Sequence, residues 1–458
     1  MGRESGGPGH SVAIRAGHGR PMATTRTLPA ATRTPRPSAR SHLGLDLMLF
    51  FLADVRDGLS PFFAMFLESV RHWSPGAIGL AFALNNIASA LCQVPAGVLV
   101  DRTQRKRLMF AISGAMVALG ALVIALVPGK SAVFTASIIL GVALAVFHPI
   151  TIGLSLGLVG RRGLAARVSR NETFNHAGNF LAALLIGGTG WLFGLTWIFI
   201  LASIFALASA AMAAIIPAHE IDHHAARGDA LPGASATPLA ALLRRRDLIA
   251  FLAVCLLFYL GNGAMLPLAS EALAAHHASG LFAASGCIMA AQLVMTLASA
   301  AVGRAVVAGV GRKTIFLVAL AVLPLRGLLL MIFHDPLAVV AVQDLDGIGS
   351  GIFGVASALI AADLMQGTGR VNLAQGAVAL AVSLGASASN LAGGLIAQYC
   401  GYDLAFLALS GAGLTAVIGC AALVPETGPR PRRDRGWIDA LFGAKMALTN
   451  AVGSVVKS

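Results

Sequence analysis

The sequence predicts an all-α membrane protein with 12 transmembrane helices in two pseudo-symmetric six-helix bundles, and three observations carry this prediction. Hydrophobic residues make up 57% of the 458 residues, whereas charged residues make up only 12%. Twelve largely apolar segments reach the length of about 20 residues that a helix needs to cross roughly 30 Å of hydrocarbon. The basic residues fall almost entirely on one predicted side of the membrane. Together these observations exclude a soluble globular domain.

The apolar segments define the helices in order. We expect six of them in a first bundle, residues 43–216, and six in a second bundle, residues 247–424. The predicted spans are 43–68, 75–100, 108–127, 131–158, 172–194, 196–216, 247–271, 279–302, 314–333, 336–362, 373–398 and 402–424. Between the bundles, residues 217–246 form the longest polar segment, which we interpret as a cytoplasmic linker.

The charge distribution orients these spans. With both termini in the cytoplasm, the cytoplasmic segments hold 29 of the 33 Lys and Arg residues, and the external loops hold only Arg71 and Lys130. This asymmetry follows the positive-inside rule, and termini on the same side require an even number of spans. Much of the net charge of +13 is therefore an orientation signal with some attraction to anionic lipid, and it does not predict a nucleic-acid site. We expect a multi-pass protein of the bacterial inner (cytoplasmic) membrane.

The two tails differ in character. Residues 1–42 are predicted to be a disordered, basic cytoplasmic tail, although Met22 as the true start and a transit peptide are alternatives. Residues 425–458 form a second cytoplasmic tail with a predicted amphipathic helix on the inner membrane surface. Its apolar face holds Trp437, Leu441, Leu448, Val452 and Val455. The five cysteines are scattered without a metal or redox spacing and are interpreted as buried small residues.

Three charges lie inside the first predicted span: Asp54, Arg56 and Asp57. Each charge at the middle of a bilayer costs roughly 2.5–3.5 kcal/mol on insertion scales. A helix tolerates this cost when the charges face the protein interior or a water-filled cavity. These residues therefore indicate movement of protons or solutes across the membrane.

Three further charges lie within later spans: Arg326, Asp344 and Asp346. Counted from the helix ends, Asp57, Arg326 and Asp346 occupy a similar layer, about 10–17 Å below the outer surface. Four acids against two bases leave two carboxylates without a fixed cation, which suits proton exchange. We predict that Arg326 pairs with Asp344, because the two lie at similar depth on consecutive helices. A purely structural network of ion pairs is the alternative.

Polar residues within other spans are candidates for lining a cavity. The histidines can also carry a proton near neutral pH, whereas an intramembrane Asn or Gln serves equally well as a hydrogen bond between helices. The candidates for substrate contact are His148, His176, Asn175, Asn262, Gln292 and Gln343. A linker cluster at 219–224 contains three histidines and two acids, but without a second ligand group we interpret it as a solvated loop and predict no metal site.

The two halves carry traces of a repeat. The segment Gly97-x-Leu99-x-Asp101-Arg102-x-x-Arg105-Lys106 lies between the second and third spans, and residues 303–313 form a weaker copy between the eighth and ninth. Recurrence of features in the same order indicates duplicated halves, which is the usual plan of secondary transporters.

This segment resembles the signature loop of the major facilitator superfamily, and the resemblance covers roughly residues 43–424. It implies that Gly97 permits close helix packing. It also implies that Asp101 forms the cytoplasmic latch of the outward-facing state together with the basic residues Arg102, Arg105 and Lys106. The sequence departs from the pattern at Gln104, where glycine is usual, and the second copy has Val307 in place of an acid.

The resemblance implies a secondary active transporter that moves a small organic solute by alternating access. We expect proton-coupled efflux, in the manner of the drug:proton antiporters of this superfamily. The alternatives are proton-coupled uptake of an organic anion or zwitterion, metal-ion export, and a non-transporting sensor. No hydrolase or protease motif is apparent in the sequence, so we predict no enzyme and no catalytic residues. We expect a monomer that uses the proton gradient without a cofactor and contacts protons, a small-molecule substrate and membrane lipid.

Overall fold

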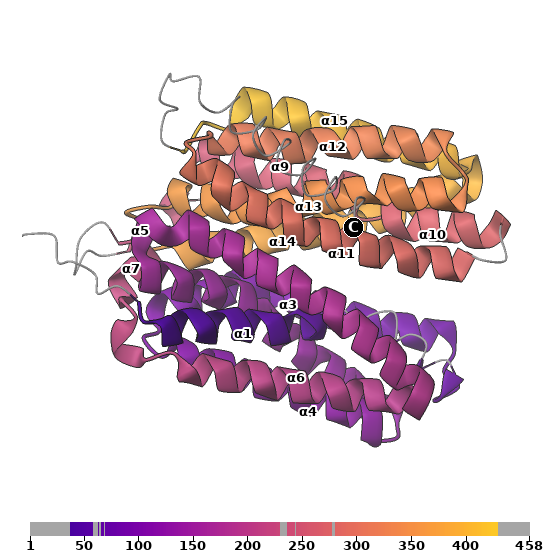
Figure 1. The fold of residues 1–458 in the computed structure, drawn as a ribbon, viewed down its shortest axis with the longest axis horizontal. Coiled ribbons are helices and arrows are strands. Elements are labelled where there is room, and N and C mark those ends of the chain that lie inside the picture. Colours follow the sequence, from indigo (N-terminus) through magenta and orange to yellow (C-terminus); the bar gives the residue numbers. More distant parts are fainter. Residues whose placement is uncertain are drawn as a thin grey trace, which may run out of the picture. The chain divides into compact units, whose positions relative to one another are not determined.

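The computed structural model describes residues 37–57, 63, 66–67, 69–229, 236–242, 244–276 and 280–428. Within these residues the chain is helical, and its few β contacts are isolated bridges of Asp229 with Gly367 and Thr368 (Figure 1). The helices of the first half are α1 (Ala39–Asp57), α3 (Pro75–Arg102), α4 (Lys106–Leu126), α5 (Lys130–Phe193) and α6 (Leu195–Ile215). The linker holds η1 (Ala218–Glu220), α7 (His223–Arg227) and α8 (Leu239–Leu242). The second half holds α9 (Arg246–Asn262), α10 (Met265–His276), α11 (Gly280–Val307), α12 (Arg312–Ile332), α13 (Pro336–Leu364), α14 (Val371–Cys400) and α15 (Tyr402–Leu423).

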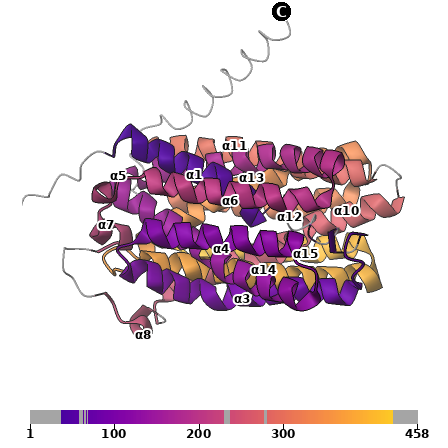
Figure 2. The same cartoon turned by 90° about the horizontal axis from the view of Figure 1, so that it is seen from below.

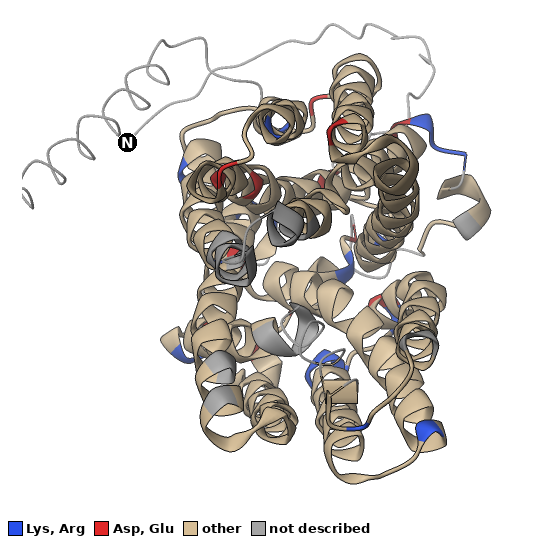
Figure 3. Ribbon diagram, turned by 90° about the vertical axis from the view of Figure 1, so that its right-hand side faces the viewer, with Lys and Arg blue, Asp and Glu red and all other residues tan. Residues whose placement is uncertain are grey.

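The described helices are those of a membrane protein. Ten of them are long and apolar enough to cross a bilayer, and Figure 3 shows that most of the ribbon carries neither acidic nor basic residues. Helix α5 contains 64 residues and is broken at Gly160, where φ is 62°. This length is about 96 Å at 1.5 Å per residue, enough for more than one crossing. The all-α membrane fold is confirmed, and the number of twelve spans stays a prediction.

Two predicted segments differ in the structure. Residues 161–171, expected in a cytoplasmic loop, are helical, because α5 resumes directly after the break at Gly160. The expected span 247–271 is divided into α9 and α10 near Gly263. A Cβ at Gly263 would lie 2.8 Å from the Cα of Ala386 on α14, so this crossing requires a glycine. The predicted amphipathic tail helix and nearly all of the N-terminal tail lie outside the described residues.

The helices pack in two groups, and two pairs of helices form most of the contact between the groups. Helices α1 and α3–α6 pack against one another, as do α9–α15 (Figure 1). Between the groups, α3 lies along α14 and α5 lies along α11 (Figure 2). The largest hydrophobic core belongs mainly to α9–α15 but includes five residues of α5. These residues are Ile152, Leu156, Leu164, Ala165 and Val168.

The five shared core residues all lie within eight positions of Gly160. The two groups therefore share their core near one end, which we name the latch end: it holds Gly160, the turn between α3 and α4, and the N-terminus of α14. The opposite end is named the far end.

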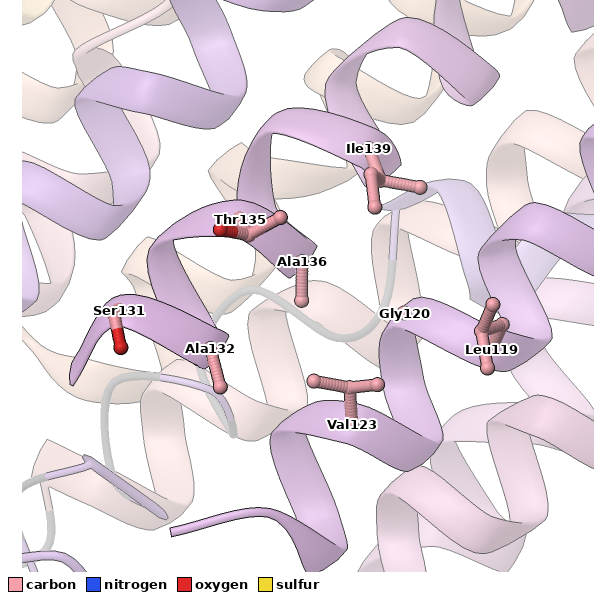
Figure 4. A pocket seen from close by; sticks show the side chains of 8 residues that line it. All are labelled: Leu119, Gly120, Val123, Ser131, Ala132, Thr135, Ala136 and Ile139. Carbon is pink, nitrogen blue, oxygen red and sulfur yellow. The ribbon is translucent and has the colours of Figure 1, made fainter. Parts of the chain in front are cut away.

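A groove between α4 and the first part of α5 has a volume of about 330 Å³. Figure 4 shows that side chains of both helices border it and that none of them is charged. Its lining residues are Leu119, Gly120, Val123, Ser131, Ala132, Thr135, Ala136 and Ile139. With two hydroxyl groups as its only side-chain polar atoms, the groove offers no group that could exchange a proton.

Glu220 of the linker closes the N-terminus of α1. Its Oε2 accepts hydrogen bonds from the backbone N–H of Ser38 at 2.9 Å and from the hydroxyl of Ser41 at 2.6 Å. These bonds lower the pKa of Glu220 below its ordinary value of 4.5. A carboxylate at an exposed helix N-terminus contributes roughly 0.3–1 kcal/mol. Because the pKa is lower in the folded state, this contribution is present above pH 4.5 and is lost as the pH falls through the lowered pKa.

We therefore expect Glu220→Gln to unfold at a lower temperature than the wild type at pH 7, by a small margin. The margin should disappear as the pH is lowered below the pKa, because both proteins then carry a neutral side chain. Thermal unfolding of the purified protein at several pH values measures it, and an equal margin at every pH would contradict the assignment.

Candidate functional site

The carboxylate of Asp101, at the end of α3, closes the start of α14. Its Oδ1 accepts hydrogen bonds from the backbone N–H of Asn372 at 3.1 Å and from its side-chain amide at 2.8 Å. Its Oδ2 accepts from the backbone N–H of Leu373 at 2.9 Å. The first N–H groups of a helix have no partner within it, and its N-terminus is electropositive, so a carboxylate satisfies both conditions. Asp101 is only 4% exposed.

The backbones of α3 and α14 approach closely beside this carboxylate. A Cβ at Gly97 would lie 2.4 Å from the carbonyl oxygen of Asn372, and a Cβ at Gly376 would lie 2.2 Å from that of Gln93. Both distances are too short for any side chain, so the crossing depends on a glycine from each helix. We name the contact of Asp101 and Gly97 with the N-terminus of α14 the latch.

The linker helix α7 covers the latch. The side-chain amide of Asn372 donates a second hydrogen bond, to the carbonyl of Ala226, at 2.9 Å. The backbone N–H of Asp222 donates to the carbonyl of Gly157 at 2.9 Å, which ties the start of α7 to α5. The linker therefore contacts both groups of helices at the latch end.

An ion-pair group lies beside the latch. Asp363 near the end of α13 is paired with Arg312 of α12 and, at 3.7 Å, with Arg161 of α5. Arg312 belongs to the degenerate copy of the signature segment. Asp363 from a neighbouring helix thus supplies a carboxylate to the second copy, which has none of its own.

Polar pairs continue along the interface from the latch end to about the middle of the helices. His148 Nε2 lies 3.1 Å from Gln375 Oε1 of α14, and His176 Nδ1 lies 3.0 Å from Gln292 Oε1 of α11. His176 also lies 3.9 Å from the carboxylate of Glu172. At 1.5 Å per residue, His176 is about 24 Å from Gly160 along α5. Between described side chains, the hydrogen bonds and ion pairs that join the two groups of helices reach no further toward the far end.

A separate network surrounds Arg326, which is 1% exposed. Its guanidinium donates to Asp346 at 2.9 Å, to Asn262 at 2.6 Å and to Gln343 at 2.6 Å. Asp346 also accepts from the hydroxyl of Ser350 at 3.1 Å. Through these described bonds the guanidinium joins three helices of the second half: α9, α12 and α13.

This chain is similar in sequence to a known protein family. The family model for the Major Facilitator Superfamily matches residues 45–323 and 259–456. The chain belongs to the major facilitator superfamily. Two uncharacterized MFS-type transporters of Mycobacterium tuberculosis, from two strains, are each 40% identical over 391 residues, covering 84% of this chain and 93% of theirs.

Solved transporters of the superfamily share the fold. The human organic anion transporter MFSD10 (TETRAN) superposes with a TM-score of 0.63 at 15% identity, over 85% of this chain and 99% of its own. A mutant of the nucleoside transporter NupG superposes with a TM-score of 0.58 at 14% identity, over 84% and 100% of the two chains. At such identities the likeness concerns the fold alone.

The structure corrects one predicted pair of this superfamily member. Arg326 is bonded to Asp346 and not to Asp344. The two acids are two positions apart, so they point about 200° apart around α13 and only one can face α12. Among described residues Asp344 makes no hydrogen bond or ion pair, and its Oδ1 is buried without a partner.

The other predicted residues fall into three groups. Asn262 and Gln343 join the Arg326 network, and His176 meets Gln292 at the interface. Asn175 is buried, while Arg102 and Arg105 are exposed and Lys106 donates to the carbonyl of Thr103 at 2.7 Å. The side chains of three residues on α1 lie outside the described part: Asp54, Arg56 and Asp57.

The sequence analysis missed a buried ion group near the latch end. Asp46 of α1 is 1% exposed and is paired with Arg167 and, at 2.6 Å, with Arg170 of α5. Arg167 also donates to Asn171 at 2.7 Å. Asp46 could have been noticed as a further acid within the first apolar segment. The sequence places both arginines in an expected loop, as orientation charges, whereas in the structure they lie on a helix and Arg167 is buried.

Proposed function

We propose that this superfamily member is a proton-coupled carrier that exports a small organic solute by alternating access. The observation that carries the proposal is the interface between the two groups of helices. In the described residues its polar contacts occupy the latch end and the middle, as expected for a carrier closed at one end. We take the latch end to be cytoplasmic, from the positive-inside asymmetry, which places both termini in the cytoplasm of a bacterial cell.

Proton coupling is supported by ionisable groups within the membrane-spanning part. Glu172 and His176 lie at the interface, and Asp344 has a buried oxygen without a partner among described residues. Intramembrane acids and histidines of this kind are typical of proton relays in transporters. Closure at the cytoplasmic end favours a resting state that loads a proton from outside, which an exporter exchanging protons for solute requires. In this proposal the carrier acts as a monomer and needs no cofactor.

Uptake of an organic anion or zwitterion is the second candidate, and the buried guanidinium of Arg326 favours it. Its described partners are the carboxylate of Asp346 and two amide oxygens, and a bound substrate carboxylate could replace the amide oxygens. The organic anion and nucleoside transporters that share the fold give the first substrate classes to examine.

Proteoliposomes with an imposed pH gradient test the proposal. We expect radiolabelled organic anions, organic cations and nucleosides to include one that accumulates in the acidic compartment, because an antiporter exchanges it for protons. Accumulation in the alkaline compartment would favour uptake by symport instead. Flux of such a solute that continues unchanged after a protonophore collapses the gradient would refute proton coupling.

A further inference from the structure

Glu172 and His176 form an acid–histidine pair where α5 meets the second half of the chain. The two residues are one turn apart on α5, with side chains that are 16% and 11% exposed. The carboxylate lies against α13, since its Oε2 is 3.4 Å from the Cβ position of Gly354. The imidazole lies against α11 through Gln292. The pair therefore lies on the contact that must break if the latch end opens.

The partner of His176 determines where its proton can go. A glutamine Oε1 accepts hydrogen bonds and cannot donate them, so Nδ1 of His176 must carry the hydrogen in the bond of 3.0 Å to Gln292. In the neutral imidazole, Nε2 then has a free lone pair. This Nε2 is buried and has no hydrogen-bond partner among described residues, and it faces Oε2 of Glu172 at 3.9 Å. The pair can therefore take up one proton, on the carboxylate or on Nε2 of the imidazole.

Most charges on the helices around this pair are engaged elsewhere; the exception on α13 is Asp344, whose Oδ1 has no partner among described residues. Arg167 and Arg170 of α5 are neutralised in part by Asp46 of α1. On α13 and α3 the acids nearest the latch end, Asp363 and Asp101, are held by arginines and by the start of α14 respectively.

Further polar residues lie on the helices around the Glu172–His176 pair. His148 of α5 is bonded to Gln375 of α14, and α11 contributes Gln292 with Thr296 one turn beyond. Lys106 of α4 is bonded to a backbone carbonyl, and α6 contains no charged residue. The side chains at 54, 56 and 57 of α1 lie outside the described part.

We propose that the Glu172–His176 pair is the proton carrier of the transport cycle, an assignment that rests on the proposed proton coupling. In the closed interface the pair holds one proton, on Oε2 of Glu172, and is neutral overall, which avoids an uncompensated buried charge. When the latch end opens, water reaches the pair, the proton leaves from Oε2 to water, and an ionised Glu172 beside a neutral His176 remains. Bound solute allows the interface to close without this proton, and once the solute has left at the far end the pair takes up its next proton from that side.

This assignment predicts that a falling pH favours closure of the latch end. In a variant without native cysteines, spin labels at the exposed positions Arg162 of α5 and Arg304 of α11 report the separation of the two helices. For one coupled proton the ratio of closed to open molecules changes by up to about tenfold per pH unit. In Glu172→Gln a neutral amide stands permanently in place of the protonated acid, so we expect a closed population that no longer varies with pH.

Asp403→Asn is the matched control, because Asp403 forms an acid–histidine pair with His334 at 3.3 Å but at an exposed position on the far end. It should keep the pH dependence of the wild type. Infrared difference spectra give a second measurement, which does not depend on the Gln variant folding. The carbonyl band of a protonated acid should appear in the wild type as the latch end closes, and it should shift in Glu172→Asp.

The outcomes distinguish the assignment to the Glu172–His176 pair from the proposed proton coupling itself. A Glu172→Gln protein with the pH dependence of the wild type, or an unshifted band in Glu172→Asp, would overturn the assignment to this pair. Proton coupling itself would survive if the wild type still responds to pH. A wild type whose label distance ignores pH, together with solute flux that ignores the pH gradient, would refute the proposed coupling as well.

Discussion

Replacing Asp101 with Ala is expected to shift the protein from the latch-closed state toward the latch-open state by about 100-fold. The substitution removes three hydrogen bonds to the start of α14 and leaves two backbone N–H groups without partners. A hydrogen bond to a charged group contributes roughly 1.5–3 kcal/mol, and the bonds here are coupled, so a total near 3 kcal/mol is reasonable. In the open state water can bind these N–H groups, so the substitution costs the open state less free energy than the closed state.

The distance between labels on α3 and α14 at the latch end measures this population, and solute flux measures its consequence. We expect flux to fall strongly, because a carrier that cannot hold one end closed cannot complete its cycle. Asp335→Ala is the matched control: Asp335 accepts from the backbone N–H groups of Leu337 and Ala338 at the start of α13, within one half of the chain. The control should weaken that helix end and leave the latch population unchanged. Equal label distances in Asp101→Ala and the wild type would show that the carboxylate does not hold the latch.

The sequence predicted the helices well because the cost of exposing polar groups to hydrocarbon leaves few alternatives. A long apolar segment in a membrane forms a spanning helix, because only a helix satisfies its backbone hydrogen bonds within the segment. The signature segment around Asp101 identifies one of the loops. The errors arose where charge was taken as a sign of a loop. Residues 161–171 are helical although four arginines lie among them, because Asp46 and Asp363 neutralise three of these.

Pairing between helices was harder to predict than the helices themselves. The charges within the spans indicated that Arg326 would pair with an acid. Asp344 and Asp346 lie at similar depth in the membrane, so depth alone could not show which of them is the partner. The choice between them depends on the rotation of α13, which is set by packing on α11 and α12 and leaves no local trace in the sequence. The sequence places Glu172 one helical turn before His176, but only the positions of α11 and α13 show that the pair lies at the contact between the two groups of helices.

Replacing Arg326 with Ala is expected to cost roughly 3–5 kcal/mol of stability, the range measured when one partner of a buried ion pair is removed. Among described residues Asp346, whose side chain is 11% exposed, would keep the hydroxyl of Ser350 as its one partner. Arg326→Lys should recover little of this, because one ammonium group cannot reach the three separate acceptors that the guanidinium fork contacts. Thermal unfolding of the purified protein measures the loss.

Removing both charges separates stability from function. The double variant Arg326→Met with Asp346→Leu should regain much of the stability that Arg326→Ala loses, since Asp346 no longer remains as a buried charge without its arginine. If the network binds or couples the solute, the stable double variant should still fail to transport it. If the network serves only packing, the double variant should transport at close to the wild-type rate. Solute flux and thermal unfolding of the same purified double variant therefore decide between a transport role and a packing role. A double variant less stable than Arg326→Ala would contradict the ion-pair account, because it would show that the loss does not come from an uncompensated Asp346.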